Sequence, residues 1–277
     1  MIIDSHTHIF PRHIRENREK LFPTEPAFKL LYQSAKSRLI GAGELINMMD
    51  RYKVDKSVIF GFPWKNSAAF MPHNDYILEM VHQYPNRLIG LGCFEPTGKS
   101  ADAEADRFIA AGGSGIGELA FYETGIDEET LDRLAPIMDL CAGRNLPVLI
   151  HTNEPVGHHY HGKTPITLAQ IYRLINRFPA NKIVLAHWGG GLFFFGLMKK
   201  EVKESLKNVY FDTAASPYLY DSRVYQIADQ TVGVDKILFG SDYPLLPPAT
   251  YFKEMAEAGL TKSQMAKNMG ENAEQLF

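Results

Sequence analysis

Ile2-Ile3-Asp4-Ser5-His6-Thr7-His8 is a short apolar run that ends in two histidines, and it begins a pattern that continues along the chain. Side chains i and i+2 of a β-strand project from the same face, so His6 and His8 should point into one space. Two imidazoles that converge at the end of a buried strand are suitable ligands for a divalent transition metal. The alternative is ordinary polar sequence at a strand end, because short motifs also occur by chance.

Seven further short apolar segments follow this first strand, and amphipathic segments with helical spacing separate them. The expected strands cover 2–8, 56–61, 88–94, 115–119, 147–151, 182–186, 208–213 and 236–242. The expected helices cover 44–52, 74–84, 101–111, 128–145, a segment that begins at Thr164-Pro165, 191–207 and 222–232. Strands that alternate with helices indicate a parallel sheet covered by helices. Eight such units match a closed (β/α)8 barrel of TIM type, and residues 261–277 are expected to add one or two closing helices.

A doubly wound open sheet is the competing α/β architecture. That fold carries a glycine-rich phosphate-binding turn after its first strand, whereas His6-Thr7-His8 occupies this place here. Residues 1–277 show no internal repeat, linker or low-complexity segment, and their length suits one barrel. We therefore expect a single α/β barrel domain over 1–277.

The composition argues against several classes of partner. A formal net charge of -3 arises from 29 basic and 32 acidic residues without blocks of one sign, so neither nucleic acid nor a membrane surface is an expected partner. No apolar run approaches the roughly 18 residues of a membrane-spanning helix, and the N-terminal residues predict a strand instead of a signal peptide. Cys93 and Cys141 have no CxxC spacing. These features predict a cytoplasmic protein that acts on a small molecule.

Side chains able to bind a metal occur at the ends of five expected strands. They are His6, His8, Glu118, His151, His187 and Asp242. The C-terminal ends of barrel strands meet at one mouth, where the catalytic residues of TIM barrels lie. Each residue alone has an ordinary explanation, such as a hydrogen-bonded histidine or a carboxylate that caps a helix. Together they predict a cation site, because buried carboxylates need a compensating charge.

The order of four motifs resembles the amidohydrolase superfamily. The motifs are HTH at 6–8, LIHT at 149–152, LAHWGG at 185–190 and FGSDYP at 239–244. They are most similar to the amidohydrolase-related branch that includes aminocarboxymuconate-semialdehyde decarboxylase, and residues 270–277 are similar to the closing helix of that branch. The resemblance covers essentially the full chain.

The resemblance implies a set of ligands for a divalent metal, commonly zinc: His6, His8, His151 and Asp242. It implies that His187 lies next to the metal-bound water as a proton-transfer group or further ligand. Two-metal members often carry a carboxylated lysine at the end of the fourth strand, where this chain has Glu118 and no lysine between 112 and 123. One or two ions are therefore expected, with Glu118 either binding a second ion or hydrogen-bonding to the substrate or the water.

The expected chemistry starts from the metal-bound water. A zinc ion with an open position lowers the pKa of its water to about 7. Asp242 is placed to orient or deprotonate this water, and His187 can move a proton to the leaving group, since the intrinsic pKa of histidine lies near neutral pH. We expect a metal-dependent hydrolase of a small amide, ester or lactone. The alternative is a metal-dependent nonoxidative decarboxylase of an unsaturated or aromatic carboxylic acid, and a third interpretation is a catalytically inactive metal-binding protein.

Substrate contacts are expected on the loops beyond the strands. His158, His161 and Lys163 follow the fifth strand and are candidates to bind an anionic group. The alternative is that they belong to a solvated polar loop.

Three further features have two interpretations each. Trp188 is a candidate wall for a substrate ring or a core residue. Arg51 is a candidate partner for a substrate carboxylate, although an arginine in the middle of a helix commonly faces solvent. Phe193-Phe194-Phe195 is expected to pack between barrel and helix, with an exposed homodimer patch as the alternative.

Overall fold

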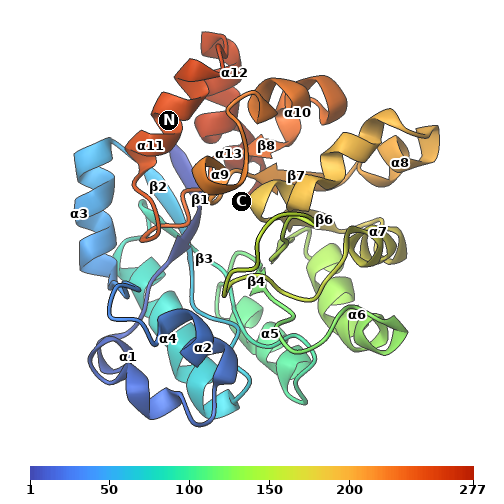
Figure 1. Ribbon diagram of the computed structural model, residues 1–277. Coiled ribbons are helices and arrows are strands. Elements are labelled where there is room, and N and C mark those ends of the chain that lie inside the picture. The colour runs from blue at the N-terminus through green and yellow to red at the C-terminus, as the bar shows by residue number, and fades with distance from the viewer.

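The computed structural model describes residues 1–277, and its strands form a closed ring surrounded by helices (Figure 1). Every strand pair is parallel, in the orders β1-β2-β3 and β4-β5-β6-β7-β8. Parallel bridges close both seams between these sheets, one from Gly92 to Ile116 and one from Thr7 to Tyr243. The predicted α/β barrel of TIM type is confirmed.

The strands are short and almost wholly buried. Their bounds are β1 (Ile3–His8), β2 (Lys56–Phe60), β3 (Leu88–Gly90), β4 (Ile116–Leu119), β5 (Pro147–Ile150), β6 (Lys182–Leu185), β7 (Val209–Asp212) and β8 (Ile237–Leu238). The last strand ends before the expected 242. Residues 239–242 still pair with β1, since Ser5 N donates to Phe239 O and Asp242 N donates to His6 O. This pairing brings the Asp242 backbone beside the first strand.

The α-helices form the outer layer. Their bounds are α1 (Arg12–Glu16), α2 (Pro26–Tyr32), α3 (Ala42–Tyr52), α4 (Ser67–Gln83), α5 (Ala101–Ala110), α6 (Glu128–Gly143), α7 (Leu168–Arg177), α8 (Lys200–Ser205), α9 (Ser216–Leu219), α10 (Val224–Val232), α11 (Pro248–Glu257), α12 (Lys262–Ala266) and α13 (Asn272–Leu276). The 3-10 helices are η1 (Arg18–Leu21), η2 (His187–Leu197) and η3 (Val234–Lys236), and η4 (Lys267–Glu271) is a π-helix.

The prediction of one helix over 191–207 is wrong. The chain instead forms η2 and then α8, and residues 188–191 have φ values from 60 to 88°. A Cβ atom at Gly190 would lie 2.3 Å from the carbonyl oxygen of Asn153. Glycine is therefore needed here both for its positive φ and because the backbone passes close to the segment after β5.

The C-terminal segment forms α12, η4 and α13, in agreement with the expected closing helices. Helix α13 packs against β1 and β8. Its Ala273 and Leu276 join a buried cluster with Ile3 and Leu238 of those two strands. Burial of this apolar surface attaches the end of the chain to its first strand.

The Phe193–Phe195 run divides between the two expected environments. Phe193 is fully buried and packs against Trp188 and Phe211, whereas Phe194 and Phe195 are about two-fifths exposed. A homodimer through this run stays a prediction. Separately, none of the helices combines the length and the apolar character that crossing a bilayer would require.

Candidate metal centre

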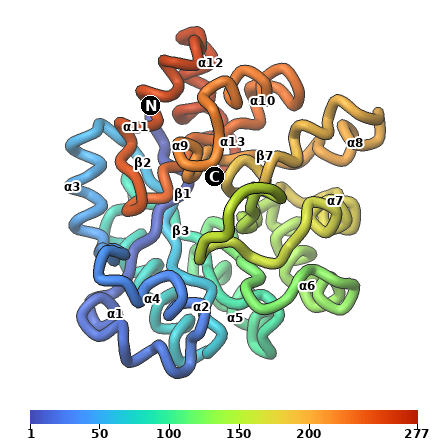
Figure 2. Tube along the Cα trace, in the orientation of Figure 1, coloured from blue at the N-terminus to red at the C-terminus, as the bar shows by residue number.

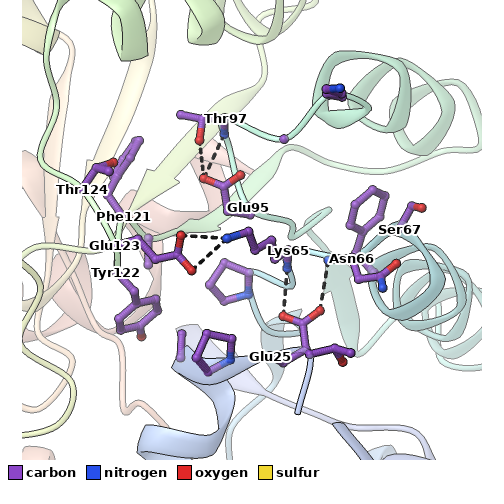
Figure 3. A pocket seen from close by; sticks show the side chains of 18 of the residues that line it. Glu25, Lys65, Asn66, Ser67, Glu95, Thr97, Phe121, Tyr122, Glu123 and Thr124 are labelled. Carbon is purple, nitrogen blue, oxygen red and sulfur yellow. Dashed lines mark hydrogen bonds and ion pairs between the residues drawn. The ribbon is translucent and has the colours of Figure 1, made fainter. Parts of the chain in front are cut away.

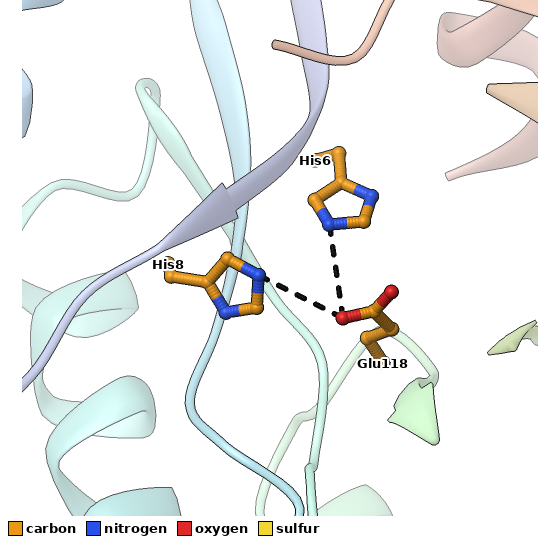
Figure 4. A group of neighbouring side chains, drawn as sticks. All are labelled: His6, His8 and Glu118. Carbon is orange, nitrogen blue, oxygen red and sulfur yellow. Dashed lines mark ion pairs between the residues drawn. The ribbon is translucent and has the colours of Figure 1, made fainter. Parts of the chain in front are cut away.

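Four side chains from three parts of the ring converge on one space at its mouth. Nε2 of His6 lies 3.8 Å from an oxygen of Glu118 and 3.8 Å from an oxygen of Asp242, and Nε2 of His8 lies 3.7 and 3.5 Å from the same two oxygens. Figure 4 shows both rings directed at Glu118. Ligand bonds of about 2.1 Å place the donor atoms of a tetrahedral zinc ion roughly 3.4 Å apart. The separations are therefore close to those around one cation.

Hydrogen bonds on the far side of the rings determine which nitrogen faces this space. Nδ1 of His8 lies 2.9 Å from the carbonyl oxygen of Gly61, and Nδ1 of His187 lies 3.0 Å from that of Ala214. A carbonyl oxygen only accepts, so Nδ1 of each neutral ring must carry the proton. In His8, Nε2 then presents its lone pair to the centre, which is what a metal ligand requires. In His187, Nε2 is the nitrogen that faces Glu118 and His151.

The surroundings of the third ring, His6, favour a positive charge beside it. Its Nε2 is buried without a hydrogen-bond partner. Burial on its own would lower the pKa of His6, but the negative charges of Asp212 and Glu118 raise it to about 10. Positive charge is thus favoured at the point to which Nε2 is directed. A mixed set of imidazole nitrogens and carboxylate oxygens suits a divalent transition metal, and the residues present fit such an ion.

His151 lies beside this donor set and forms a second group with Glu118 and His187. Its Nδ1 is 2.8 Å from Oε1 of Glu118 and 3.2 Å from Nε2 of His187, while its Nε2 donates to the carbonyl oxygen of Gly162 at 3.0 Å. Burial would raise the pKa of Glu118, but His151 and His6 hold it well below its usual range, so Glu118 is ionised. Three acceptor atoms then face one another, and a proton or the cation must lie between them. Coordination by His151 together with His6, His8 and Asp242 stays a prediction.

Sequence reasoning missed Asp212, at the end of β7. One of its oxygens accepts from Nδ1 of His6 at 2.9 Å, and the other accepts from the backbone N–H of His187 at 2.9 Å and of Ala214 at 3.0 Å. The available signal was the same as for Asp242, namely a carboxylate at a strand end. Asp212 orients one candidate ligand and the backbone of another.

Replacing this carboxylate tests that role. We expect Asp212→Asn to lower metal affinity by about 10- to 100-fold, as is usual when the partner of a metal-binding histidine is lost. Isothermal titration with Zn²⁺ or Mn²⁺ measures the effect, and Asp139→Asn, a change at an exposed aspartate of α6, is the matched control. Equal affinity in the two variants would show that Asp212 does not support the centre.

A cavity of about 930 Å³ opens above the centre. Its lining falls into three kinds of side chain. The buried end holds His8, Glu118, His151, His187 and Asp242, the aromatic walls include Tyr32, Phe62 and Tyr122, and the exposed end carries Lys36, Arg38, His158 and His161. The rings of Phe62 and Tyr122 stack with centroids 5.9 Å apart. The cavity therefore combines a candidate cation site, flat apolar walls and a basic entrance.

Two of the predicted substrate residues reach this cavity and the other three do not. His158 and His161 line it. Lys163 is bound to Glu154 at 2.9 Å, so its charge is already paired. Lys163 also does not line the cavity, which argues against the predicted contact between Lys163 and an anionic group.

Trp188 and Arg51 lie elsewhere. Trp188 is fully buried, donates from Nε1 to the Ser216 hydroxyl at 2.9 Å and packs on Tyr225. Arg51 is exposed near the end of α3, and its guanidinium lies 5.5 Å from the ring centroid of Tyr52. Neither residue lines the cavity. Their positions agree with the alternative interpretations, a core residue for Trp188 and a solvent-facing helix residue for Arg51.

A second cavity of about 750 Å³ lies next to the first and shares Pro63 and Tyr122 with it. Figure 3 shows this second cavity from close by. Lys65 pairs there with Glu123 at 2.8 Å, and Glu25 accepts from the backbone N–H groups of Lys65 and Asn66. None of the candidate metal ligands lines it. The candidate cation site therefore opens into the first cavity and not into the second.

The family model described as "Amidohydrolase" matches residues 3–277. No curated protein matches the chain by sequence. Among solved structures, 5-carboxyvanillate decarboxylase from Sphingomonas paucimobilis matches with a TM-score of 0.77 and 18% identity, covering 100% of this chain and 98% of that one.

Two other solved structures differ in their named chemistry. A dihydroxybenzoic acid decarboxylase from a Polaromonas species, with bound manganese and the inhibitor 2-nitroresorcinol, has a TM-score of 0.71 and 16% identity, covering 99% of this chain and 96% of that one. A putative 2-pyrone-4,6-dicarboxylic acid hydrolase from Pseudomonas putida has a TM-score of 0.69 and 15% identity, covering 99% of this chain and 96% of that one. At these identities the likeness shows the shared fold.

Proposed function

The chain belongs to the amidohydrolase family, and from this premise we propose that it is a metal-dependent nonoxidative decarboxylase of an aromatic carboxylic acid. The sequence alone favoured hydrolysis of a small amide, ester or lactone. Similarity to structures of two aromatic-acid decarboxylases supports the alternative better than the main prediction. The observation that carries the proposal is the group formed by Glu118, His151 and His187, three acceptors that face one another at the buried end of an aromatic cavity, where a proton can lie between them.

The candidate ligands in this proposal are His6, His8, Glu118 and Asp242, with His187 at their edge. When bound, a divalent ion supplies Lewis-acid stabilisation of negative charge on substrate oxygens. The donor set accommodates zinc, which the sequence predicted, and also manganese, which the dihydroxybenzoic acid decarboxylase structure contains.

The protein's own groups supply the proton. Nonoxidative decarboxylation breaks the bond between a ring carbon and its carboxylate, releases CO2 and forms a carbon–hydrogen bond with one added proton. Nε2 of His187 lies 3.4 Å from the ionised Glu118 and 3.2 Å from Nδ1 of His151. Burial lowers the pKa of His187, but hydrogen bonding to Glu118 and its charge raise it above the ordinary value overall. His187 is therefore suited to hold a proton and deliver it to carbon.

The walls and entrance of the cavity suit the proposed substrate class. Phe62 and Tyr122 can stack on an aromatic ring. Lys36 and Arg38 come from the segment between α2 and α3, and neither forms an ion pair with the protein. Free cations at the entrance favour an anionic ligand.

We expect Arg38→Ala to raise KM for the carboxylate substrate by about tenfold, with little change in kcat. A tenfold rise in KM corresponds to the loss of one charged hydrogen bond. Steady-state kinetics provides the measurement. Arg51→Ala removes an exposed arginine outside the cavity and is the matched control. Equal KM values for the two variants would remove Arg38 from the substrate site.

Assays of gas release and acid formation test the reaction itself. The protein, loaded with Zn²⁺ or Mn²⁺, is incubated with a panel of hydroxylated benzoic acids, unsaturated carboxylic acids, lactones, amides and esters. We expect CO2 release from an aromatic acid, one CO2 for each decarboxylated product, with loss of the activity after chelation. A new carboxylic acid from a lactone, amide or ester, without CO2, would instead support the hydrolase. Metal binding without any turnover would support the inactive interpretation.

A further inference from the structure

The segment between β5 and α7, residues 151–167, passes over the ring next to α7 (Figure 2). A buried contact closes its base. Oδ1 of Asn153 accepts from the backbone N–H of Thr164 at 2.8 Å and from its hydroxyl at 2.7 Å. Residues 154–163 therefore form a loop with a fixed neck, which we call the β5–α7 loop.

An ion pair inside this loop is unusually protected from water. Lys163 donates to Glu154 at 2.9 Å, and the Tyr160 hydroxyl donates to the other oxygen of Glu154 at 2.9 Å. The side chains of Glu154 and Lys163 are 15% and 16% exposed, whereas every other lysine or arginine ion pair has at least one partner that is 35% exposed or more. Reduced contact with water strengthens a Coulomb interaction, so this pair restrains the loop more than a surface pair would.

The restrained part of the loop touches the proposed proton-holding group. Gly162, the residue before Lys163, accepts a hydrogen bond from Nε2 of His151 at 3.0 Å. With Nε2–H used in this way, Nδ1 is the nitrogen directed at Glu118 and His187. If the Gly162 carbonyl moved away, the His151 ring would be free to rotate, or its proton could move from Nε2 to Nδ1.

We infer that Glu154 and Lys163 are positioning residues, whose ion pair holds the Gly162 carbonyl against His151 and so directs Nδ1 of that ring at Glu118 and His187. The inference rests on the proposed function only in assigning proton delivery to this group. Neither residue touches the reacting atoms, and their effect passes through the orientation of one ring.

The first test removes the cation of the pair. Lys163→Met should lower kcat by about tenfold, while KM and metal content change little. A tenfold loss is usual when a histidine of a site loses a group that orients it. Lys163→Arg should restore most of kcat because it keeps the charge. Lys65→Met removes the exposed Lys65–Glu123 pair of the second cavity and is the matched control. Unchanged kcat in Lys163→Met, or no recovery in Lys163→Arg, would overturn the inference.

A double variant tests the route through His151. Once His151→Ala has removed the ring, adding Lys163→Met should lower kcat no further, because two residues that act through one contact are not additive. An equal fall in both backgrounds would mean that Lys163 acts by another route, against the inference.

A spectroscopic test needs no substrate. In zinc-loaded protein with ¹⁵N-labelled histidine, the His151 signals should report protonated Nε2, and Lys163→Met should shift them toward the other tautomer or an average. Unchanged His151 signals in this variant would overturn the inference. This measurement separates a failure of the positioning role from a failure of the proposed decarboxylation.

Discussion

A His6→Ala variant should no longer bind stoichiometric metal, and its turnover should fall by about 10³-fold. A fall of this size is associated with loss of the main electrostatic stabilisation of a transition state. His6 is fully buried, and its Nε2 belongs to two of the three groups of side chains able to hold an ion. The same nitrogen has no hydrogen-bond partner in the protein. Elemental analysis and turnover, measured on the same sample, test the expectation.

A check of the fold and two further variants, His8→Gln and His82→Ala, accompany this measurement. His6→Ala leaves Asp212 without its imidazole partner, so circular dichroism must show that the fold persists. His8→Gln removes a second candidate ligand at a less buried position and should also lose metal. His82→Ala, at an exposed histidine near the end of α4, is the control. Full metal content in folded His6→Ala and His8→Gln would contradict the proposed centre.

A His187→Asn variant should show a second large effect of a different kind. We expect kcat to fall by about 10²- to 10⁴-fold, the range for loss of a general acid or base, with metal content retained. Asparagine stays polar but cannot carry the proton that we propose for His187, whose Nε2 lies beside Glu118 and His151. Kinetics and elemental analysis together give the answer, with His82→Asn as control. A parallel loss of metal would make His187 a ligand instead of a proton donor.

Strand-end chemistry explains why much of the centre could be predicted from the sequence. The His6–His8 pair needs only the two-residue period of a strand, and Glu118, His151 and Asp242 follow from the common end of parallel strands. The same rule applies to Asp212, although this residue lies outside the four motifs that indicate the family. Its contact with His6 joins residues 206 positions apart.

The errors concern residues whose role depends on a tertiary partner or an unusual backbone. Lys163 is a candidate to bind an anionic group from its place in the loop, but Glu154 pairs with its charge. Trp188 follows a candidate catalytic histidine, yet its positive φ and the glycines after it turn the chain so that the indole enters the core. Arg51 was ambiguous from helical position alone, and its exposure decides the question. None of these partners can be read from local spacing.

The most direct test of the account is a crystal structure of the protein grown with Mn²⁺ or Zn²⁺, with the ion located by anomalous scattering. We expect one ion at about 2.0–2.3 Å from Nε2 of His6 and His8 and from an oxygen of Asp242, with His187 at the edge of the same space. An ion bound elsewhere, or a mouth without an ion while His6 and Asp242 point apart, would contradict it.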